Sequence, residues 1–448
     1  MKAKLFCASL LCSLVLACAG FMGSHKDDIT VHEWGTFTSV QGGDGILLSW
    51  KPLQTSKLPG FVHNWTKPGL NLQAGGLFAF GKGSMMSLQR METPVIYFYG
   101  KQEQTVDVTV QFPRGIITEW YPQVAEIGPS FVPRNSTLTS ADRMIHQVGA
   151  LTNVSLADYF GAKDVTNSMA HWANIQISPK ASSRGASSEL LTDASGSHYF
   201  AARATDSLLA RTRSLSPTNS AYEYDKFLFY RGVGNFATPL KVTMPSEDHI
   251  TLTNNDASAL PHLFVITVSG QSGKFSHLAS LAPHQSISVP FDKAASLLPM
   301  ETFKKDLAKE LASSLVAQGL FPKEAKAMVN TWKDSWLEEE GMRVLYILPR
   351  PWTDGTLPIT IKPQPKELVR VMVGRAEIIP PDIQHNLAAK LLKAGQGDAQ
   401  AGDEAQAALK KLGRFAEPAF YKALESISFT NMDNSRLQAL LTKVKASD

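Results

Sequence analysis

Cysteine is missing from almost all of this 448-residue chain. The three cysteines, Cys7, Cys12 and Cys18, all lie within the first 18 residues. Everything after Cys18 therefore lacks a disulfide framework, a thiolate metal site and a cysteine nucleophile. A body of this length does not depend on disulfides, because it can bury a large hydrophobic core.

Long apolar runs are also missing outside the first residues. The run over residues 5–16 follows Lys2 and Lys4, is too short to span a bilayer, and is followed by small residues at 17–20. This layout predicts a signal peptide over residues 1–18 and a flexible tether over 19–28. We therefore expect an exported protein that is periplasmic or lipid-anchored, with its body outside the cytoplasm.

Two cleavage sites overlap at Cys18. Residues 14–18 (Leu-Val-Leu-Ala-Cys) resemble a bacterial lipobox, in which Cys18 is lipidated and becomes the first residue. Residues 17–19 (Ala-Cys-Ala) equally fit an ordinary signal-peptidase site. If the lipobox is used, the lipid on Cys18 is the only membrane attachment that the sequence predicts.

The chain has no large excess of basic over acidic residues. The chain has 44 basic and 40 acidic residues, a formal net charge of +4, and two of the lysines lie in the leader, so the body carries about +2 (4 − 2). The basic residues do not cluster. A nucleic-acid partner is therefore not expected.

The common catalytic motifs are absent. There is no P-loop, no dinucleotide-binding G-x-G-x-x-G, no G-x-S-x-G and no calcium-loop spacing. His32-Glu33 continues as Trp34-Gly35-Thr36, so no second histidine follows one helical turn later. The sequence predicts no cofactor and no metal site from a local motif. Sites assembled from distant strands leave no such signature.

Alternating apolar residues and turn signals predict a mainly β fold of the antiparallel β-sandwich type. Residues 105–112 are a clear example, with Val106, Val108 and Val110 on one side and Asp107 and Thr109 on the other. Similar strands alternate with turns from residue 29 onward. We expect the β-sandwich body to span residues 29–297 and further strands to return at 342–380.

Helical patterns interrupt and then end the chain. Apolar residues every four positions from Phe303 to Leu315, and a second stripe after Pro322, predict a helical hairpin inserted at residues 298–341. Glu338-Glu339-Glu340 is interpreted as its solvated end. An alternative is a small α+β domain over about 298–380. Residues 381–448 are expected to form a helical C-terminal cap, and residues 408–424 resemble one HEAT-type repeat unit.

The candidate site is suggested by charged residues that alternation places on the apolar faces of strands. Glu33 shares a predicted face with Val31 and Phe37, and an isolated buried carboxylate there would cost several kcal/mol. The same conflict recurs at four further residues, namely Arg90, Glu92, Glu119 and Arg231. Alternation places Arg90 and Glu92 on one face with Ile96 and Phe98. Such conflicts often mark functional sites.

Two interpretations of these charges remain open. The carboxylates Glu33, Glu92 and Glu119 could form a catalytic cluster that binds a hard metal ion or supplies the acid and base of glycoside hydrolysis, with His32 as a further ligand or proton carrier. Alternatively, they pair with arginines such as Arg90, Arg114 or Arg231 in buried bridges. Aromatic side chains, including Trp34 and Trp120, could stack on a sugar or simply fill the core.

Several segments resemble exported bacterial proteins of unassigned function. The resemblance rests on residues 32–38 (His-Glu-Trp-Gly-Thr-Phe-Thr), 92–99, 118–122, 229–234 and 371–375 and runs through most of the body. It implies one contiguous unit behind an export signal and carries no activity, ligand or site residue.

The sequence therefore predicts an exported envelope protein that binds a glycan, a peptide or a partner protein. The binding candidates are His32, Trp34, Arg90, Trp120 and Arg231. The alternative is a secreted hydrolase that uses Glu33, Glu92 and Glu119, with or without a metal. Oligomeric state is not predicted.

Overall fold

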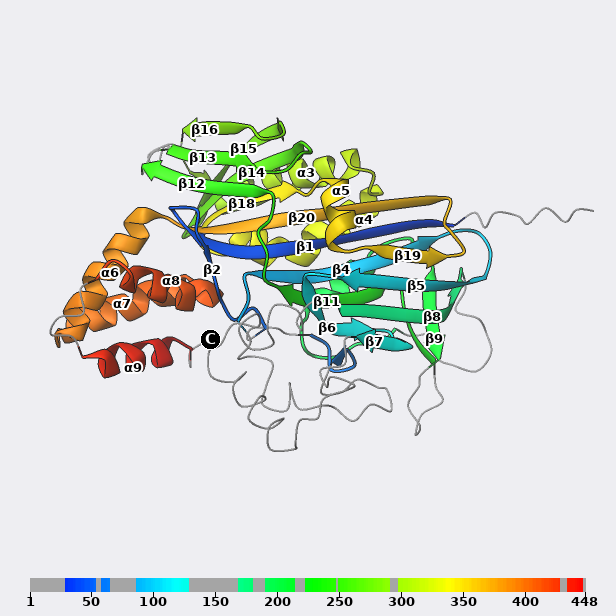
Figure 1. The fold of residues 1–448 in the computed structure, drawn as a ribbon, viewed down its shortest axis with the longest axis horizontal. Coiled ribbons are helices and arrows are strands. Elements are labelled where there is room, and N and C mark those ends of the chain that lie inside the picture. Colours follow the sequence, from blue (N-terminus) through cyan, green and yellow to red (C-terminus); the bar gives the residue numbers. More distant parts are fainter. Residues whose placement is uncertain are drawn as a thin grey trace, which may run out of the picture.

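The computed structural model describes residues 29–53, 58–64, 86–128, 168–179, 190–213, 222–246, 249–290, 297–427 and 433–445. The predicted signal peptide, the tether and Cys18 lie outside these ranges. The fold is mainly β with helices inserted before its last strands and at its C-terminal end, which confirms the predicted fold class (Figure 1).

A large central sheet runs through the molecule. Within the described ranges it contains eleven strands, in the spatial order β17 (Leu298–Pro299), β15 (Ser272–Leu281), β14 (Leu260–Ser269), β18 (Gly341–Ile347), β20 (Glu367–Ile379), β1 (Thr30–Gly42), β4 (Gln89–Tyr99), β11 (Leu228–Gly234), β6 (Gly115–Tyr121) and β3 (His63–Asn64), with β2 (Leu47–Leu48) paired to β1. Strands from both ends of the sequence therefore meet at its centre.

Two smaller sheets pack on one face of the central sheet. One contains β10 (Tyr222–Asp225), β9 (Leu209–Arg213), β8 (Ser168–Ser178), β5 (Gln104–Phe112) and β19 (Ile359–Lys362), with β7 (Glu126–Gly128) paired to β8, and the other contains β12 (Leu240–Ser246), β13 (His249–Asn254) and β16 (Ser286–Pro290). The alternation in β5 buries Val106, Val108 and Val110 against the central sheet. These layers make the sandwich.

One pairing differs from the predicted antiparallel arrangement. β1 and β20 run parallel, from Thr30 opposite Glu367 to Gly42 opposite Ile379. The other strand pairs found in the described residues are antiparallel. Turn signals fix the direction of neighbouring strands in a hairpin, but they say nothing about two strands this far apart in sequence.

The helical hairpin covers the other face of the central sheet. It consists of α3 (Met300–Ala317), α4 (Pro322–Lys333) and a π turn, η4 (Asp334–Glu338). The predicted stripe of Phe303, Leu307, Leu311 and Leu315 is buried. Because β18 and β20 belong to the same sheet as β1, the hairpin is inserted between strands of one sheet. A short 3-10 helix, η3 (His198–Arg203), packs beside α4.

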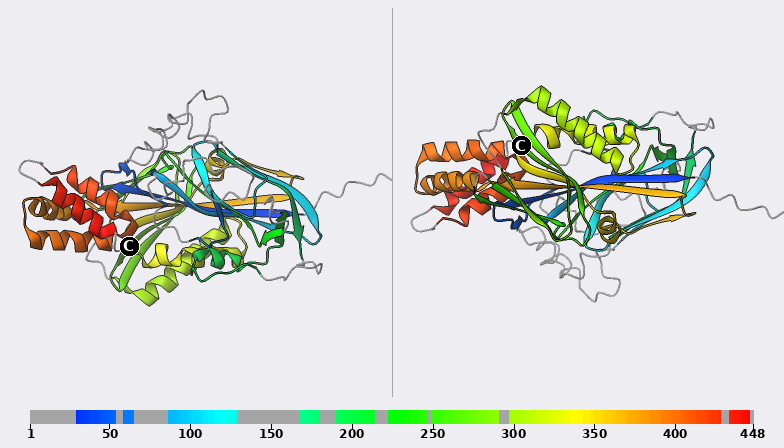
Figure 2. Two further views of the ribbon diagram at one scale, coloured as in Figure 1. Left: turned by 90° about the horizontal axis from the view of Figure 1, so that it is seen from below. Right: turned by 90° about the horizontal axis from the view of Figure 1, so that it is seen from above.

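The C-terminal cap lies beyond one end of the central sheet. It contains α6 (Pro381–Gly395), α7 (Ala399–Lys411), a 3-10 turn η5 (Gly413–Phe415), α8 (Ala416–Leu424) and α9 (Asn434–Lys445). Its core continues into Val40, Trp50 and Ile379 of the β body. Figure 2 shows the orange to red cap helices past the sheet end and the yellow-green hairpin on one face.

Helix α5 (Arg350–Thr356) links β18 to β19. None of the helices in the described ranges is long and apolar enough to cross a membrane.

Candidate functional site

Glu33 lies on the sandwich-facing side of β1 and is fully buried. Arg370 Nε donates to Glu33 Oε2 at 2.5 Å, and the Tyr230 hydroxyl donates to Oε1 at 2.5 Å. Arg370 also reaches Asp354 at 2.8 Å. Burial opposes the charge on Arg370, but Glu33 and Tyr230 outweigh burial and raise its pKa. Glu33 is therefore part of a closed pair, and its partner is an arginine that the sequence did not single out.

A β-bulge in β4 changes the direction of the side chains before it. Trp34 of β1 lies opposite Val95, but Thr36 lies opposite Glu92, so β4 has one residue more than β1 over this stretch. The register against β11 shifts at the same place. Thr93 within the bulge has φ +47°, a left-handed conformation that is uncommon outside glycine.

The bulge overturns the predicted face of β4. Ile96 and Phe98 point into the sandwich core, whereas Glu92 points to the side of the helical hairpin and the cap. Strict alternation placed Arg90, Glu92, Ile96 and Phe98 together, and that prediction was wrong because the extra residue inverts the pattern. Glu92 therefore lies on the opposite face from Glu33.

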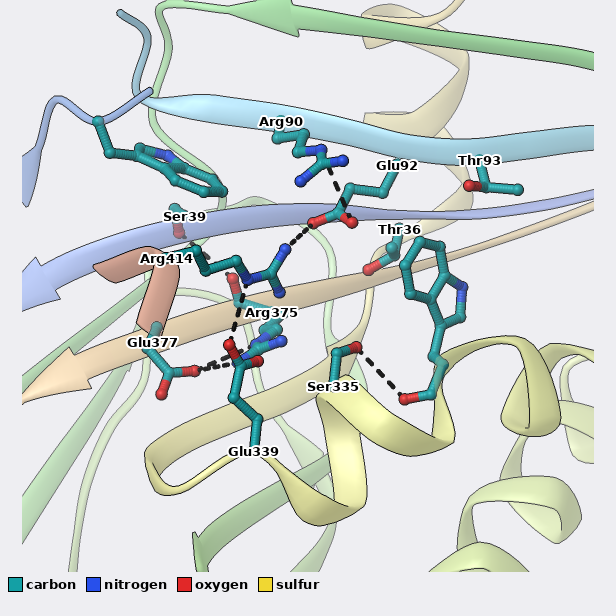
Figure 3. A network of polar contacts seen from close by, with 12 residues as sticks. Thr36, Ser39, Arg90, Glu92, Thr93, Ser335, Glu339, Arg375, Glu377 and Arg414 are labelled. Carbon is teal, nitrogen blue, oxygen red and sulfur yellow. Dashed lines mark hydrogen bonds and ion pairs between the residues drawn. The ribbon is translucent and has the colours of Figure 1, made fainter. Parts of the chain in front are cut away.

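Arg90 and Glu92 begin a chain of alternating charges that crosses five parts of the fold. Figure 3 shows it from Arg90 to Glu377. The chain joins β4, turn η5 of the cap, the end of the π turn, β20 and β18. Its successive members, Arg90, Glu92, Arg414, Glu339, Arg375, Glu377 and Arg343, have nitrogen–oxygen distances of 3.7, 3.0, 3.4, 2.7, 2.6 and 3.1 Å. We call these seven residues the ionic chain.

Because the ionic chain is largely buried, the charge of each carboxylate in it depends on the neighbouring arginines. Burial would raise the pKa of Glu92, but Arg90 and Arg414 outweigh it and hold that pKa far below its ordinary value. Burial also opposes the charge on Glu339, and Arg375 and Arg414 overcome it and lower the pKa to about 2. The prediction of a solvated Glu338-Glu339-Glu340 end was therefore wrong for Glu339, because the cap supplies a cation that the local sequence does not reveal.

Glu119 and Arg231 lie beside the ionic chain. They are register neighbours on β6 and β11, both are fully buried, and the Thr118 hydroxyl donates to Glu119. His198 Nε2 lies 3.4 Å from the Thr93 hydroxyl. Burial, together with the charge of Arg231, lowers the pKa of His198 to about 3, so this imidazole is neutral at neutral pH.

The three candidate carboxylates do not meet in an open cleft. The negative charges of Glu92 and Glu119 both favour the charged forms of Arg90 and Arg231, on the hairpin side of the sheet. Glu33 lies on the sandwich side, where it accepts from Tyr230. All three are at most 2% exposed. Among the residues that the structure describes, no group of three or more histidine, cysteine, aspartate or glutamate side chains could hold a metal ion.

The remaining binding candidates on β1 and β6 are core residues. Trp34 and Trp120 are fully buried, so neither presents a ring to a sugar. His32 Nδ1 lies 2.6 Å from Glu324 Oε2, and the same oxygen accepts the backbone N–H of Phe321 at 2.8 Å. Glu324 thereby joins the first turn of α4 to β1, which is a structural role.

A pocket of about 640 Å³ lies between the β body and the cap. One wall is the ends of β14, β18 and β20, and the other is α6 and α7. Apolar side chains predominate on these walls, and they include Val268, Leu297, Met342, Ile383, Leu412 and Phe415. We call this pocket the cap groove. Its volume and mostly apolar lining are those of a ligand site.

The cap groove is continuous with the ionic chain. Glu377 belongs to both, and Phe415 of the groove wall lies under the guanidiniums of Arg375 and Arg414, at 5.3 and 4.9 Å from the ring centre. Charged side chains on the groove include Lys390 and Glu404, which face each other at 3.6 Å. The same arginines therefore fix both the position of the cap and one wall of the groove.

The sequence patterns did not single out several residues of this region. Arg370 and Arg375 lie within the apolar strand β20, so the signal that singled out Glu33 would have found them. Arg414 gave no signal, because it lies in a short turn between cap helices. Helical periodicity could not show that the cap meets the sheet, and the cap groove was missed for this reason.

No protein-family model and no curated protein matches the chain. Among solved structures, it is similar to the yeast delta-COP-I mu-homology domain, with a TM-score of 0.26 and 8% identity over 79% of this chain and 98% of that one. The same yeast domain complexed with the Dsl1 WxWxV peptide gives a TM-score of 0.27 and 7% identity over the same shares. Values this low do not establish a common fold, and nothing is carried over from that domain.

Proposed function

We propose that this protein is an exported, non-enzymatic binding protein that takes an apolar peptide segment of a partner protein in the cap groove. The groove itself is the observation that carries the proposal. Its aliphatic walls exclude water from apolar side chains, and its charged rim leaves a peptide backbone in contact with polar groups. Ile383 of α6 is 40% exposed on this wall, so it is accessible to a segment bound in the groove.

A peptide suits the cap groove better than a glycan. Sugar sites stack pyranose faces on aromatic rings, whereas Phe415 is the one aromatic side chain among the residues that line the groove in the described structure. Its ring is also buried, at 3% exposure, beneath two guanidiniums. The hydrolase alternative has less support, because Glu33, Glu92 and Glu119 are buried and the first two are paired with arginines.

The peptide-binding proposal is tested by placing a charge in the groove. A displayed library of random dodecapeptides is selected on the full mature chain, and enriched sequences are synthesised and measured by fluorescence polarisation. We expect apolar peptides whose Kd rises at least tenfold, about 1.4 kcal/mol, in Ile383→Arg, because the cation must be desolvated against the bound segment.

Ile46→Arg is the matched control. Ile46 is 57% exposed, lies at the turn between β1 and β2, and does not line the groove. It should bind the same peptides as the unmodified chain does. Equal loss in both variants, equal binding in both, or no enrichment of apolar peptides would each contradict the proposal.

Export through a lipid anchor is a separate part of the proposal. It is supported by the lipobox-like residues 14–18 and has its own test. Expressed in a bacterial host, the chain should be found in the membrane fraction with a mass that includes diacylglycerol at an N-terminal Cys18. Cys18→Ser should move it out of that fraction. An unmodified mature chain beginning after Ala19 would instead favour ordinary signal-peptidase cleavage.

A further inference from the structure

Arg90 is a buried guanidinium with an unsatisfied donor. It is 3% exposed, and its Nε has no hydrogen-bond partner in the described part of the chain. The carboxylate found within ion-pair range is Glu92, at 3.7 Å, which is too far for a hydrogen bond. Glu92 is already engaged by Arg414 at 3.0 Å. A buried guanidinium Nε without a hydrogen-bond partner is unusual in a protein interior.

The ionic chain also carries one more cation than anions. It begins and ends on an arginine, so four guanidiniums alternate with three carboxylates, and Arg231 and Glu119 beside it add one charge of each sign. A buried net charge is costly unless a counter-ion is present. Among the seven members of the ionic chain, arginines therefore outnumber carboxylates by one.

The poorly paired arginine of the ionic chain is at its Arg90 end. At the opposite end, Arg343 donates to Glu377 and to the backbone carbonyls of Trp336 and Glu339, so its donors are used. At the Arg90 end, burial lowers the pKa of the guanidinium to about 9, and Glu92 offsets only part of this effect. The nearby His198 is neutral because it is buried, and the charge of Arg231 adds to this effect.

We infer that the Arg90 end of the ionic chain is a binding site for a small carboxylate. A carboxylate matches the guanidinium fork through two parallel hydrogen bonds and brings a single negative charge, which balances the extra arginine of the ionic chain. A phosphate dianion would bring one charge too many beside Glu92 and Glu119. Figure 3 shows Arg90, Glu92 and Thr93 side by side on this face of β4, with Arg414 approaching from the cap. The site is distinct from the cap groove and stands whether or not the groove binds peptides.

Thermal melting in different anions tests this inference. The full mature chain is melted in sodium acetate, sodium chloride and sodium phosphate at one pH and one ionic strength. We expect a saturable rise in Tm of several degrees in acetate over chloride, with half-saturation in the millimolar range and no such rise in phosphate. Equal melting in acetate and chloride would overturn the site, and a larger rise in phosphate would overturn the choice of carboxylate.

Substitution of Arg90 supplies the second readout. Arg90→Met removes the surplus charge and leaves Glu92 paired with Arg414, so this variant should melt no lower than the unmodified chain in chloride and should lose the response to acetate. Arg436→Met, at a side chain 56% exposed in the cap, should keep the full response. A response that persists in Arg90→Met would show that acetate binds elsewhere. If Arg90→Met does not fold, the three-anion comparison on the unmodified chain still decides the inference.

Discussion

Replacing Glu33 with glutamine should lower the free energy of unfolding by about 3–5 kcal/mol, because the buried Arg370 then keeps only the half-exposed Asp354 as a charged partner. The 2.5 Å contacts from Arg370 and Tyr230 both depend on a charged acceptor, since charge-assisted hydrogen bonds are the stronger kind. In a thermal melt we expect a fall in Tm of roughly 3–6 °C at neutral pH, since a chain of this length unfolds with a large entropy.

Glu301→Gln is the control for this prediction. The Glu301 side chain is 89% exposed at the start of α3 and pairs with Lys304 on the surface, so its loss should change stability by less than about 0.5 kcal/mol. An unchanged or higher Tm in Glu33→Gln would show that Glu33 is held at the expense of stability. That outcome would favour a functional role for this carboxylate.

Replacing Arg414 with methionine should detach the cap from the β body. Arg414 bridges Glu92 of β4 and Glu339 after the π turn, and it lies over Phe415 and Trp50. Removing it leaves the buried Glu92 and the partly buried Glu339 with fewer cations, at an expected cost of about 3–5 kcal/mol. Hydrogen exchange should accelerate in α6 to α9 well before it changes in the central sheet.

Arg436→Met tests whether this effect is specific. Arg436 also lies in the cap, but its side chain is 56% exposed and pairs with Asp433 three residues earlier. Its loss should leave the exchange of the cap unchanged. If Arg414→Met accelerates exchange equally throughout the chain, or not at all, Arg414 does not join the cap to the body.

The two stability predictions concern opposite faces of the central sheet. Glu33 stabilises the sandwich side, and Arg414 stabilises the other side, where the hairpin and the cap meet the sheet. Because the two sites share no partner, their effects should be close to additive in a double variant. The ionic chain, in contrast, should show strong coupling among its own members.

The sequence by itself determined the fold class and the helical elements. Alternation in β5, the four-residue stripe from Phe303 to Leu315 and the turn signals between strands are local, because each reports only which face of one element is buried. The same logic singled out Glu33, Glu92 and Glu119, and all three are buried, although Glu92 lies on the opposite face from the predicted one. It could not say what they touch.

Tertiary structure alone decided the partners and the site. The parallel pairing of β1 with β20 brings Arg370 to Glu33, and the bulge at Thr93 sends Glu92 to the opposite face. The docking of the cap supplies Arg414 and closes the cap groove. Each depends on contacts between residues hundreds of positions apart, and one extra residue in a strand inverts its faces. A periodic pattern read along one segment contains neither kind of information.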